Sequence, residues 1–112
     1  MFMAVVILGG LIFLSKPSSG QYDEFSQCLT NNGAKMYGAY WCPHCNSQKS
    51  MFGNSFDKID YIECSLPGGN GQNQVCNNAG IQSYPTWEFN NGQRQTGVLS
   101  LQQLSQLTGC PL

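Results

Sequence analysis

Six cysteines within 112 residues are the feature that most limits what this chain can fold into. Disulfides do not persist in a reducing cytosol, so a high and even cysteine count favours an oxidising compartment, a metal site, or both. The count alone leaves the pairing open. The cysteines are Cys28, Cys42, Cys45, Cys64, Cys76 and Cys110.

The size and composition of the chain predict one folded domain. Its 112 residues leave no room for a second domain of ordinary size. Hydrophobic residues make up 41% and aromatic residues 12%, which is enough to build a core rather than a disordered chain. Charged residues are only 10% and the formal net charge is −1, so the basic surplus of a nucleic-acid-binding protein is missing.

The N-terminal segment, residues 1–15, is dominated by an apolar run from Met1 to Leu14. As a helix the run is about 21 Å long, shorter than the hydrocarbon core of about 30 Å, although snorkelling by Lys16 extends its reach. It fits a short membrane anchor, the apolar part of a signal sequence, or an anchor whose first residues precede this chain. An ordinary signal sequence has Lys or Arg before its apolar part, and no such residue precedes this run. A buried core helix is disfavoured, because the run is apolar all round and a breaker-rich linker, residues 16–20, follows it.

The remaining part, residues 21–112, has the pattern of a single α/β domain without an internal repeat. Apolar spacing and turn residues predict the order α-β-α-β-α-β-β-α. Asn91 and Gly92 predict a two-residue type I′ hairpin, and Ser100 with Gln103 predicts a capping box. Helices are expected over residues 22–32, 43–56, 73–79 and 100–108, strands over 35–41, 60–64, 85–89 and 93–98, and a loop over 66–72.

One motif carries chemistry: Trp41, Cys42, Pro43, His44 and Cys45, placed between a core strand and a helix. Cys42 lies where free N–H groups at the helix start favour a thiolate, the nucleophilic form of cysteine. Proline suits the first helical position, which needs no N–H. Cys45 lies one turn further, where it can close a disulfide and resolve a mixed one. Between the cysteines, His44 is a candidate partner for the thiolate, and Trp41 a candidate shield for the pair.

With this motif between a strand and a helix, and with the β-β-α pattern near its end, the chain resembles the thioredoxin superfamily over about residues 21–109. The Cys-Pro-His-Cys sequence is the form seen in DsbA-type periplasmic oxidases. The longer strings over residues 36–45, 61–64 and 83–87 look closer still to the thioredoxin-like domains associated with bacterial vitamin K epoxide reductase homologues. Those domains face outward and exchange disulfides with the membrane enzyme, whereas this chain lacks its multi-span domain.

The resemblance implies a thioredoxin fold, a central mixed sheet of four strands flanked by helices. It implies that Pro85 is a cis-proline facing the redox pair and that the backbone beside it, at Tyr84, docks extended substrate. Trp41 would lie at the same site. Ordinary thioredoxins carry a buried carboxylate six residues before the first cysteine, where this chain has Met36. That departure argues against thioredoxin-style proton transfer and against a role as a general reductant.

The resemblance also suggests that Cys64 and Cys76 form a structural disulfide around a Gly-rich loop; a second shuttle pair is the alternative. For Cys28 on the first helix and Cys110 at the chain end we expect a disulfide, with two buried thiols as the alternative.

We expect a thiol–disulfide oxidoreductase that introduces disulfides into exported proteins and needs no bound cofactor or metal. Its partners would be protein thiols and a quinone-linked membrane oxidase, similar to vitamin K epoxide reductase or DsbB. The domain would be anchored outside the cytoplasm, or secreted if the N-terminal segment is cleaved. The first alternative is a reductase or isomerase in the same compartment. The second is a non-enzymatic binding module stapled by cysteines, in which Cys42 and Cys45 form a structural disulfide or half of a zinc site.

Overall fold

The structure, a computed structural model, describes residues 20–112. The expected anchor over residues 1–15 and the linker residues 16–19 lie outside the described residues. Within residues 20–112, no helix combines the length and the apolar character that crossing a membrane requires.

Four strands form one mixed sheet in the order β2-β1-β3-β4. The central strand β1 pairs in parallel with β2 and antiparallel with β3, and β3 pairs antiparallel with the edge strand β4. In this register Met36 of β1 faces Tyr61 of β2 on one side and Trp87 of β3 on the other. The elements are α2 (Asp23–Asn31), β1 (Lys35–Gly38), α3 (Pro43–Phe52), β2 (Tyr61–Glu63), α4 (Gln74–Asn78), β3 (Thr86–Glu88), β4 (Arg94–Thr96) and α5 (Leu101–Thr108).

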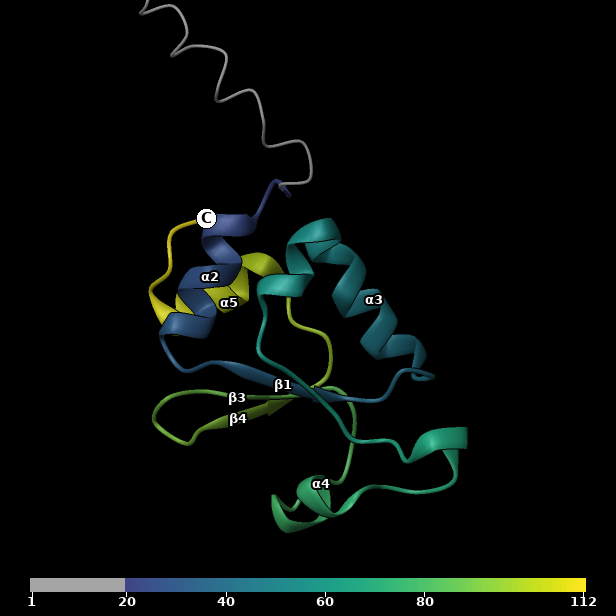
Figure 1. The fold of residues 1–112 in the computed structure, drawn as a ribbon. Coiled ribbons are helices and arrows are strands. Elements are labelled where there is room, and N and C mark those ends of the chain that lie inside the picture. Colours follow the sequence, from purple (N-terminus) through teal and green to yellow (C-terminus); the bar gives the residue numbers. More distant parts are fainter. Residues whose placement is uncertain (1–19) are drawn as a thin grey trace, which may run out of the picture.

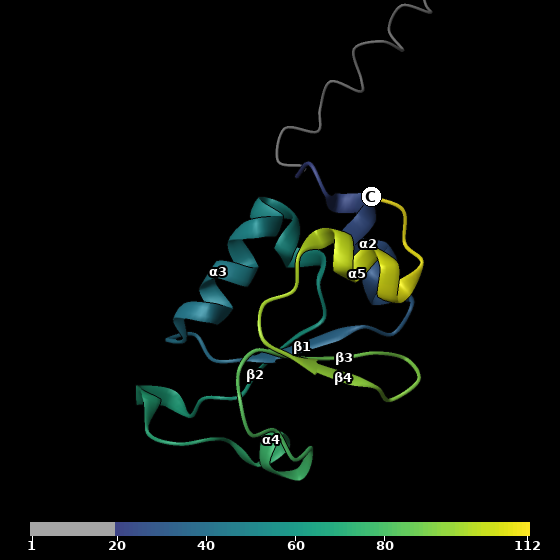
Figure 2. The ribbon, with the colours of Figure 1, turned by 180° about the vertical axis from the view of Figure 1, so that it is seen from behind.

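The two faces of the sheet are covered unequally. Helices α2, α3 and α5 lie on one face and the short α4 on the other, as the two opposite views show (Figures 1 and 2). Because side chains alternate along a strand, Met36 points into the larger core and Tyr37 into the smaller one. The larger core holds Phe25, Leu29, Ala34, Met36, Ala39, Cys42, Cys45, Phe52, Ile59, Trp87, Phe89, Leu99, Leu104 and Cys110, and the smaller holds Tyr37, Cys64, Cys76 and Ile81.

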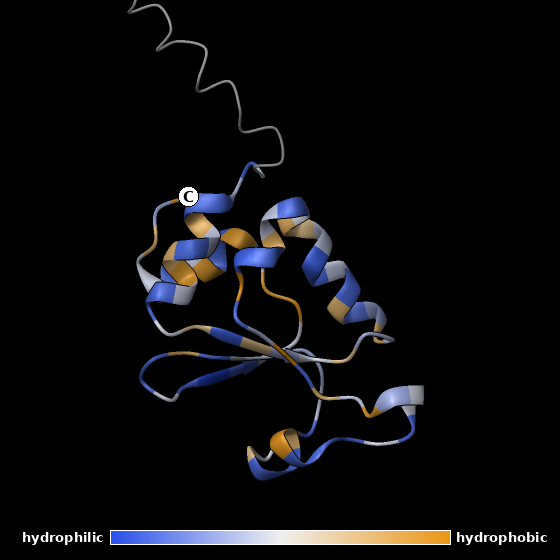
Figure 3. Cartoon of the chain, viewed as in Figure 1, coloured by the Kyte–Doolittle hydropathy of each residue, from blue (hydrophilic) through white to orange (hydrophobic). Residues whose placement is uncertain are grey.

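The edge strand β4 is polar along its whole length and appears blue in Figure 3. Its three residues, Arg94, Gln95 and Thr96, are all exposed. Arg94 forms an ion pair with Glu88 of the neighbouring strand, at 2.9 Å. A polar, charged edge discourages pairing with the strands of another chain.

The order of helices and strands agrees with the sequence prediction, and so does the capping box of Ser100 and Gln103 at the start of α5. The helix expected over residues 43–56 is shorter than predicted. It ends at Phe52, because Gly53 adopts a positive φ of 57°, and a 3₁₀ helix, Gly53–Lys58, follows. The observed strands are also shorter than the predicted ones, by one to three residues at their ends.

The prediction of a type I′ turn at Asn91 and Gly92 was wrong. A type I′ turn needs positive φ at both residues, and of the two only Gly92 has it, at 83°. Instead, Gly92 N–H donates to the Phe89 carbonyl, and Phe89 N–H donates to the Gln93 carbonyl. These bonds belong to a three-residue loop with the glycine in the left-handed position. The side chain of Asn91 accepts from Gln93 N–H at 2.9 Å, which holds this form.

The helix α3 is fixed to the sheet by the fully buried side chain of Gln48. Its Oε1 accepts from the indole N–H of Trp87 at 3.0 Å and from the backbone N–H of Leu99 at 2.8 Å. Its Nε2 donates to the Leu99 carbonyl at 2.9 Å. A buried amide with its partners satisfied in this way fixes α3 against both β3 and the segment before α5.

Candidate active site

Cys42 and Cys45 lie at the start of α3, just beyond the end of β1. Cys42 is the N-cap residue, Pro43 occupies the first turn, and the backbone N–H of Cys45 donates to Cys42 Sγ at 3.3 Å. Free N–H groups at a helix start stabilise negative charge, so this bond favours a thiolate at Cys42. Both side chains are buried, but Cys42 retains 6% exposure whereas Cys45 has none.

Tyr84 and Pro85 face the cysteines from the loop before β3. The peptide bond between them is cis. The thiol of Cys42 donates to the Tyr84 carbonyl across 3.9 Å, so the structure brings these residues together although they are 42 positions apart. The resemblance implied a cis bond at this place, and the structure contains one.

Trp41 lies beside the pair with about half of its surface exposed. Its ring meets Tyr84 edge-on at a centroid distance of 5.9 Å, and its N–H donates to Ser65 Oγ at 2.9 Å. Tyr40 is exposed to the same extent. Two half-exposed aromatic side chains thus precede Cys42 in the chain, and a shielding role for Trp41 stays a prediction.

The environment of Cys45 disfavours its charged form. Burial raises the pKa of the Cys45 thiol to about 12, against the smaller lowering effects of a backbone hydrogen bond at Ala39 and the Lys49 charge. A thiol held neutral attacks slowly unless a neighbouring group takes its proton.

Among the residues that the structure describes, His44 has no hydrogen bond that would support the role the sequence suggested. Its side chain is exposed on α3 and, within residues 20–112, forms no hydrogen bond with either cysteine. The structure thus leaves the expected tuning of the thiolate by His44 without a direct contact.

Glu63 of β2 is a site residue that the sequence motifs did not indicate. In the structure its Oε1 accepts from the Tyr61 hydroxyl at 2.8 Å. Its Oε2 accepts from the backbone N–H of Tyr40 at 3.1 Å and of Ser65 at 3.0 Å. The sequence signal for the pair of Tyr61 and Glu63 is their spacing. Residues two positions apart on a strand lie on the same face, and that face of β2 turns toward α3.

The other four cysteines form two disulfides. Cys28 of α2 is joined to Cys110 after α5, with a sequence separation of 82 and a Cα–Cα distance of 5.9 Å. Cys64 is joined to Cys76 of α4, with a sequence separation of 12 and a Cα–Cα distance of 5.5 Å. Cys42 and Cys45 carry free thiols. Within the described part of the chain, no three His, Cys, Asp or Glu side chains gather as metal ligands would.

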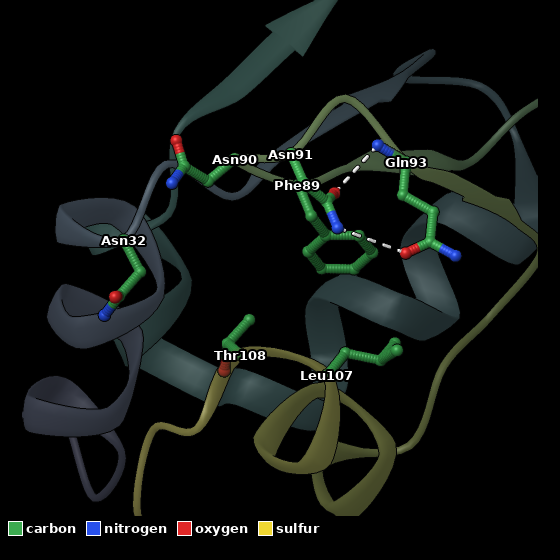
Figure 4. Close-up of a pocket in the computed structure, with 7 residues that line it drawn as sticks. All are labelled: Asn32, Phe89, Asn90, Asn91, Gln93, Leu107 and Thr108. Carbon is green, nitrogen blue, oxygen red and sulfur yellow. Dashed lines mark hydrogen bonds between the residues drawn. The ribbon is translucent and has the colours of Figure 1, made fainter.

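The pocket drawn in Figure 4 lies at the opposite end of the sheet from the cysteines, beside the β3–β4 loop. It holds about 220 Å³ and is lined by residues of that loop, α2 and α5. Its only drawn hydrogen bonds join Asn91 to Gln93 (Figure 4). The lining contains no ionisable side chain, and its one hydroxyl, that of Thr108, donates to the Leu104 carbonyl, so this pocket contributes nothing to the chemistry of the site.

Comparisons with known proteins agree with this geometry. No family model matches the chain. The chain is 38% identical over 103 residues to the thiol-disulfide oxidoreductase LTO1 of Arabidopsis thaliana. The match covers 88% of this chain and 27% of that protein, so the chain spans about a quarter of the length of this curated relative. The similarity to a protein of this name agrees with a redox role for the paired cysteines of this site.

Proposed function

We propose that this chain exchanges disulfides with protein thiols through Cys42 and Cys45. One observation carries the proposal: Cys42 caps α3 with its sulfur next to the Tyr84 carbonyl, while Cys45 lies buried one turn behind it. An extended substrate lying along the Tyr84–Pro85 backbone would bring its own sulfur to Cys42. The similarity to a thiol-disulfide oxidoreductase supports the same chemistry.

The oxidised pair reacts in two steps. A substrate thiolate attacks Cys42 Sγ, the Cys42–Cys45 bond breaks, and Cys45 leaves as a thiolate that takes up a proton. A second substrate thiolate then attacks the substrate sulfur of the mixed disulfide and releases Cys42 as a thiolate. The substrate loses two electrons and gains a disulfide, and the enzyme pair gains the two electrons. No bound cofactor enters these steps.

We propose further that the reaction runs toward oxidation of exported proteins. Met36 is fully buried. It occupies the position where ordinary thioredoxins carry a buried carboxylate, so this chain lacks one feature of a general reductant. Two further disulfides suit an oxidising compartment. A quinone-linked membrane partner, similar to vitamin K epoxide reductase or DsbB, would reoxidise the pair. The apolar N-terminal segment would anchor the domain outside the cytoplasm, or direct its secretion if it is cleaved.

Trapping of mixed disulfides tests the roles of the two cysteines. Cys45→Ala should accumulate covalent complexes in which Cys42 has attacked a substrate disulfide, because the Cys45 thiol that would release the substrate is missing. Cys42→Ala, the matched control, should accumulate none. Non-reducing gels after acid quenching read the result. Complexes with Cys42→Ala but not with Cys45→Ala would contradict the assignment.

The reduction potential of the Cys42–Cys45 pair distinguishes an oxidase from the alternative, a reductase or isomerase. An oxidase should lie near about −120 mV and a thioredoxin-like reductant near about −270 mV. Equilibration with glutathione measures the value. A non-enzymatic binding module is a third possibility, and it predicts that the native protein exchanges no disulfide with a small-molecule thiol.

A further inference from the structure

Tyr61 and Glu63 form a polar pair, and the Tyr61 hydroxyl borders the same small space as the buried thiol of Cys45. Tyr61 of β2 packs against the core that contains Cys45 and donates its hydroxyl proton to Glu63. Gly38 of β1 leaves the space between the thiol and the phenol open. A β-carbon at Gly38 would lie 2.9 Å from Cys45 Sγ and 3.3 Å from Tyr61 Oη, so both groups border the same small space.

We propose that Tyr61 and Glu63 form a proton relay for Cys45, in which the phenol hydroxyl connects the buried thiol to the carboxylate. The inference rests on the proposed function, because it matters only when Cys45 makes and breaks a disulfide. Both are positioning residues: they act on Cys45 and do not touch the substrate.

The surroundings of Cys45 show why such a relay is needed. Burial raises the pKa of Cys45 to about 12, so at neutral pH the thiol holds its proton strongly. Cys42 and Lys49, both on α3, are the other titratable groups that act on it from that helix, and Tyr84 faces it from the cis-proline loop. The ammonium nitrogen of Lys49 lies over the Tyr61 ring, 4.2 Å from the ring centroid. Met36, opposite Tyr61 in the sheet register, is a thioether that accepts no proton.

The proton balance is closed within the protein. When Cys45 attacks a mixed disulfide at Cys42, a bond forms between the two sulfurs and the substrate leaves as a thiolate. The thiol proton of Cys45 passes to the Tyr61 oxygen, and the Tyr61 proton passes to the Glu63 carboxylate. When the disulfide is opened by a substrate thiolate, the same transfers run backward and protonate the departing Cys45.

The geometry of Glu63 suits this role. Two backbone N–H groups, from Tyr40 and Ser65, bind its Oε2 and leave Oε1 directed at the Tyr61 hydroxyl. The carboxylate thereby links the relay to the two loops that flank the cysteines. The same bonds to both loops would suit a purely structural residue. The decisive test therefore measures a property that the loss of a structural residue would not change.

The test uses the reduced full chain and 5,5′-dithiobis(2-nitrobenzoic acid), whose coloured thiolate is released in two phases. The first release reports attack by Cys42, and the second reports resolution by Cys45. Cys45→Ala should abolish only the second phase and so assign it. In Tyr61→Phe and Glu63→Gln we expect the first phase to be unchanged and the second to slow at least about tenfold at pH 7, as for loss of a general base.

The pH profile separates the relay from a structural effect. Without the relay, the second rate should rise about tenfold per pH unit from pH 6 to 9, because only the small thiolate fraction of Cys45 reacts. The unaltered protein should show a shallower rise. Tyr37→Phe is the matched control, since Tyr37 lies on β1 but faces the other core, and it should behave as the unaltered protein.

Each outcome decides the matter. Second phases in Tyr61→Phe and Glu63→Gln that match the unaltered protein at every pH would overturn the relay while leaving the proposed function intact. Absence of a second phase in the unaltered protein would instead overturn the proposed function. If Glu63→Gln fails to fold, Tyr61→Phe decides alone, because it removes a single oxygen atom.

Discussion

The two active-site cysteines differ in chemistry although only one helical turn separates them. Cys42 caps the helix, receives an N–H hydrogen bond and keeps a small exposed surface. Cys45 has no exposed surface, and its burial raises its pKa to about 12. Under the proposed function, we therefore expect Cys42 to react with other proteins and Cys45 to react only with Cys42.

The raised pKa of Cys45 predicts a loss of stability at alkaline pH. The folded state holds the thiol proton up to about pH 12, whereas the unfolded chain releases it near the ordinary thiol pKa of 9.0. This contribution is therefore complete below pH 9 and is lost as the pH rises toward 12. Burial also raises the pKa of Tyr61, which acts in the same direction.

Chemical denaturation of Cys42→Ala and of the double variant Cys42→Ala/Cys45→Ala, between pH 7 and 10.5, measures the effect. The first variant keeps Cys45 as a thiol without a partner, and the second removes it. The free energy of unfolding should fall more steeply with pH in the first. Parallel curves would show that Cys45 titrates alike in the folded and unfolded states.

His44 should have only a small effect on the reduction potential. An exposed charge near a thiolate contributes up to about 1 kcal/mol, which corresponds to about 20 mV for this two-electron couple. Because thiolate stabilisation favours the reduced form, His44→Ala should lower the potential by about 10–20 mV. Glutathione equilibration checks this, with Ser47→Ala on the same helix as control. A fall of 60 mV or more would mean that the imidazole contacts the sulfur.

At the scale of elements, local rules decided what could be predicted. Strong local signals, such as proline at the start of α3 and the Ser100–Gln103 capping box, give helix starts that agree with the structure. The type of the β3–β4 turn was predicted wrongly because Asn91 tolerates negative as well as positive φ. The Asn91–Gly92 dipeptide alone therefore does not select the turn type. The contact between Glu63 and Tyr40 could not be predicted, because the two residues are 23 positions apart and the fold alone brings them together, whereas Tyr61 and Ser65 are only two residues from Glu63.

The disulfide between Cys64 and Cys76 holds α4 to the end of β2. It closes a loop with a sequence separation of 12, worth about 3 kcal/mol in the chain-entropy model. Both cysteines have no exposed surface, so a mild reductant that opens Cys42–Cys45 should leave this bond intact. Differential alkylation followed by peptide mass mapping reads each cysteine separately. Alkylated Cys64 and Cys76 in the native, unreduced protein would contradict the pairing.

At the scale of the whole molecule, the sheet is covered by three helices on one face and by one short helix on the other. The sequence predicted the order of the elements, and its resemblance to the thioredoxin superfamily implied a four-stranded mixed sheet flanked by helices. It did not predict the imbalance, since periodicity shows that a helix has an apolar side but not which face of the sheet that side meets.

The disulfide between Cys28 and Cys110 connects the first helix of the described fold to the segment after the last one. Cross-links that close long loops restrict the unfolded chain most, and removal of a native one from a small domain costs about 2–5 kcal/mol. Cys28→Ser with Cys110→Ser should therefore lower the melting temperature and leave disulfide exchange at Cys42 unchanged. Calorimetry and the two-phase thiol assay measure these two properties. An unchanged melting temperature would count against a stabilising bond.

The buried amide of Gln48 determines how a partner can recognise the oxidation state of this protein. Three of its hydrogen bonds fix α3 to β3 and to the segment before α5, a fourth goes to Met51 Sδ, and none involves the sulfur of Cys42 or Cys45. We therefore expect this frame to stay in place when the Cys42–Cys45 bond is made or broken, so that the oxidised and reduced forms present the same outline. Discrimination between an enzyme ready to give a disulfide and one ready to receive it would then rest on the sulfur atoms themselves, on their charge and their bond, rather than on any change of shape.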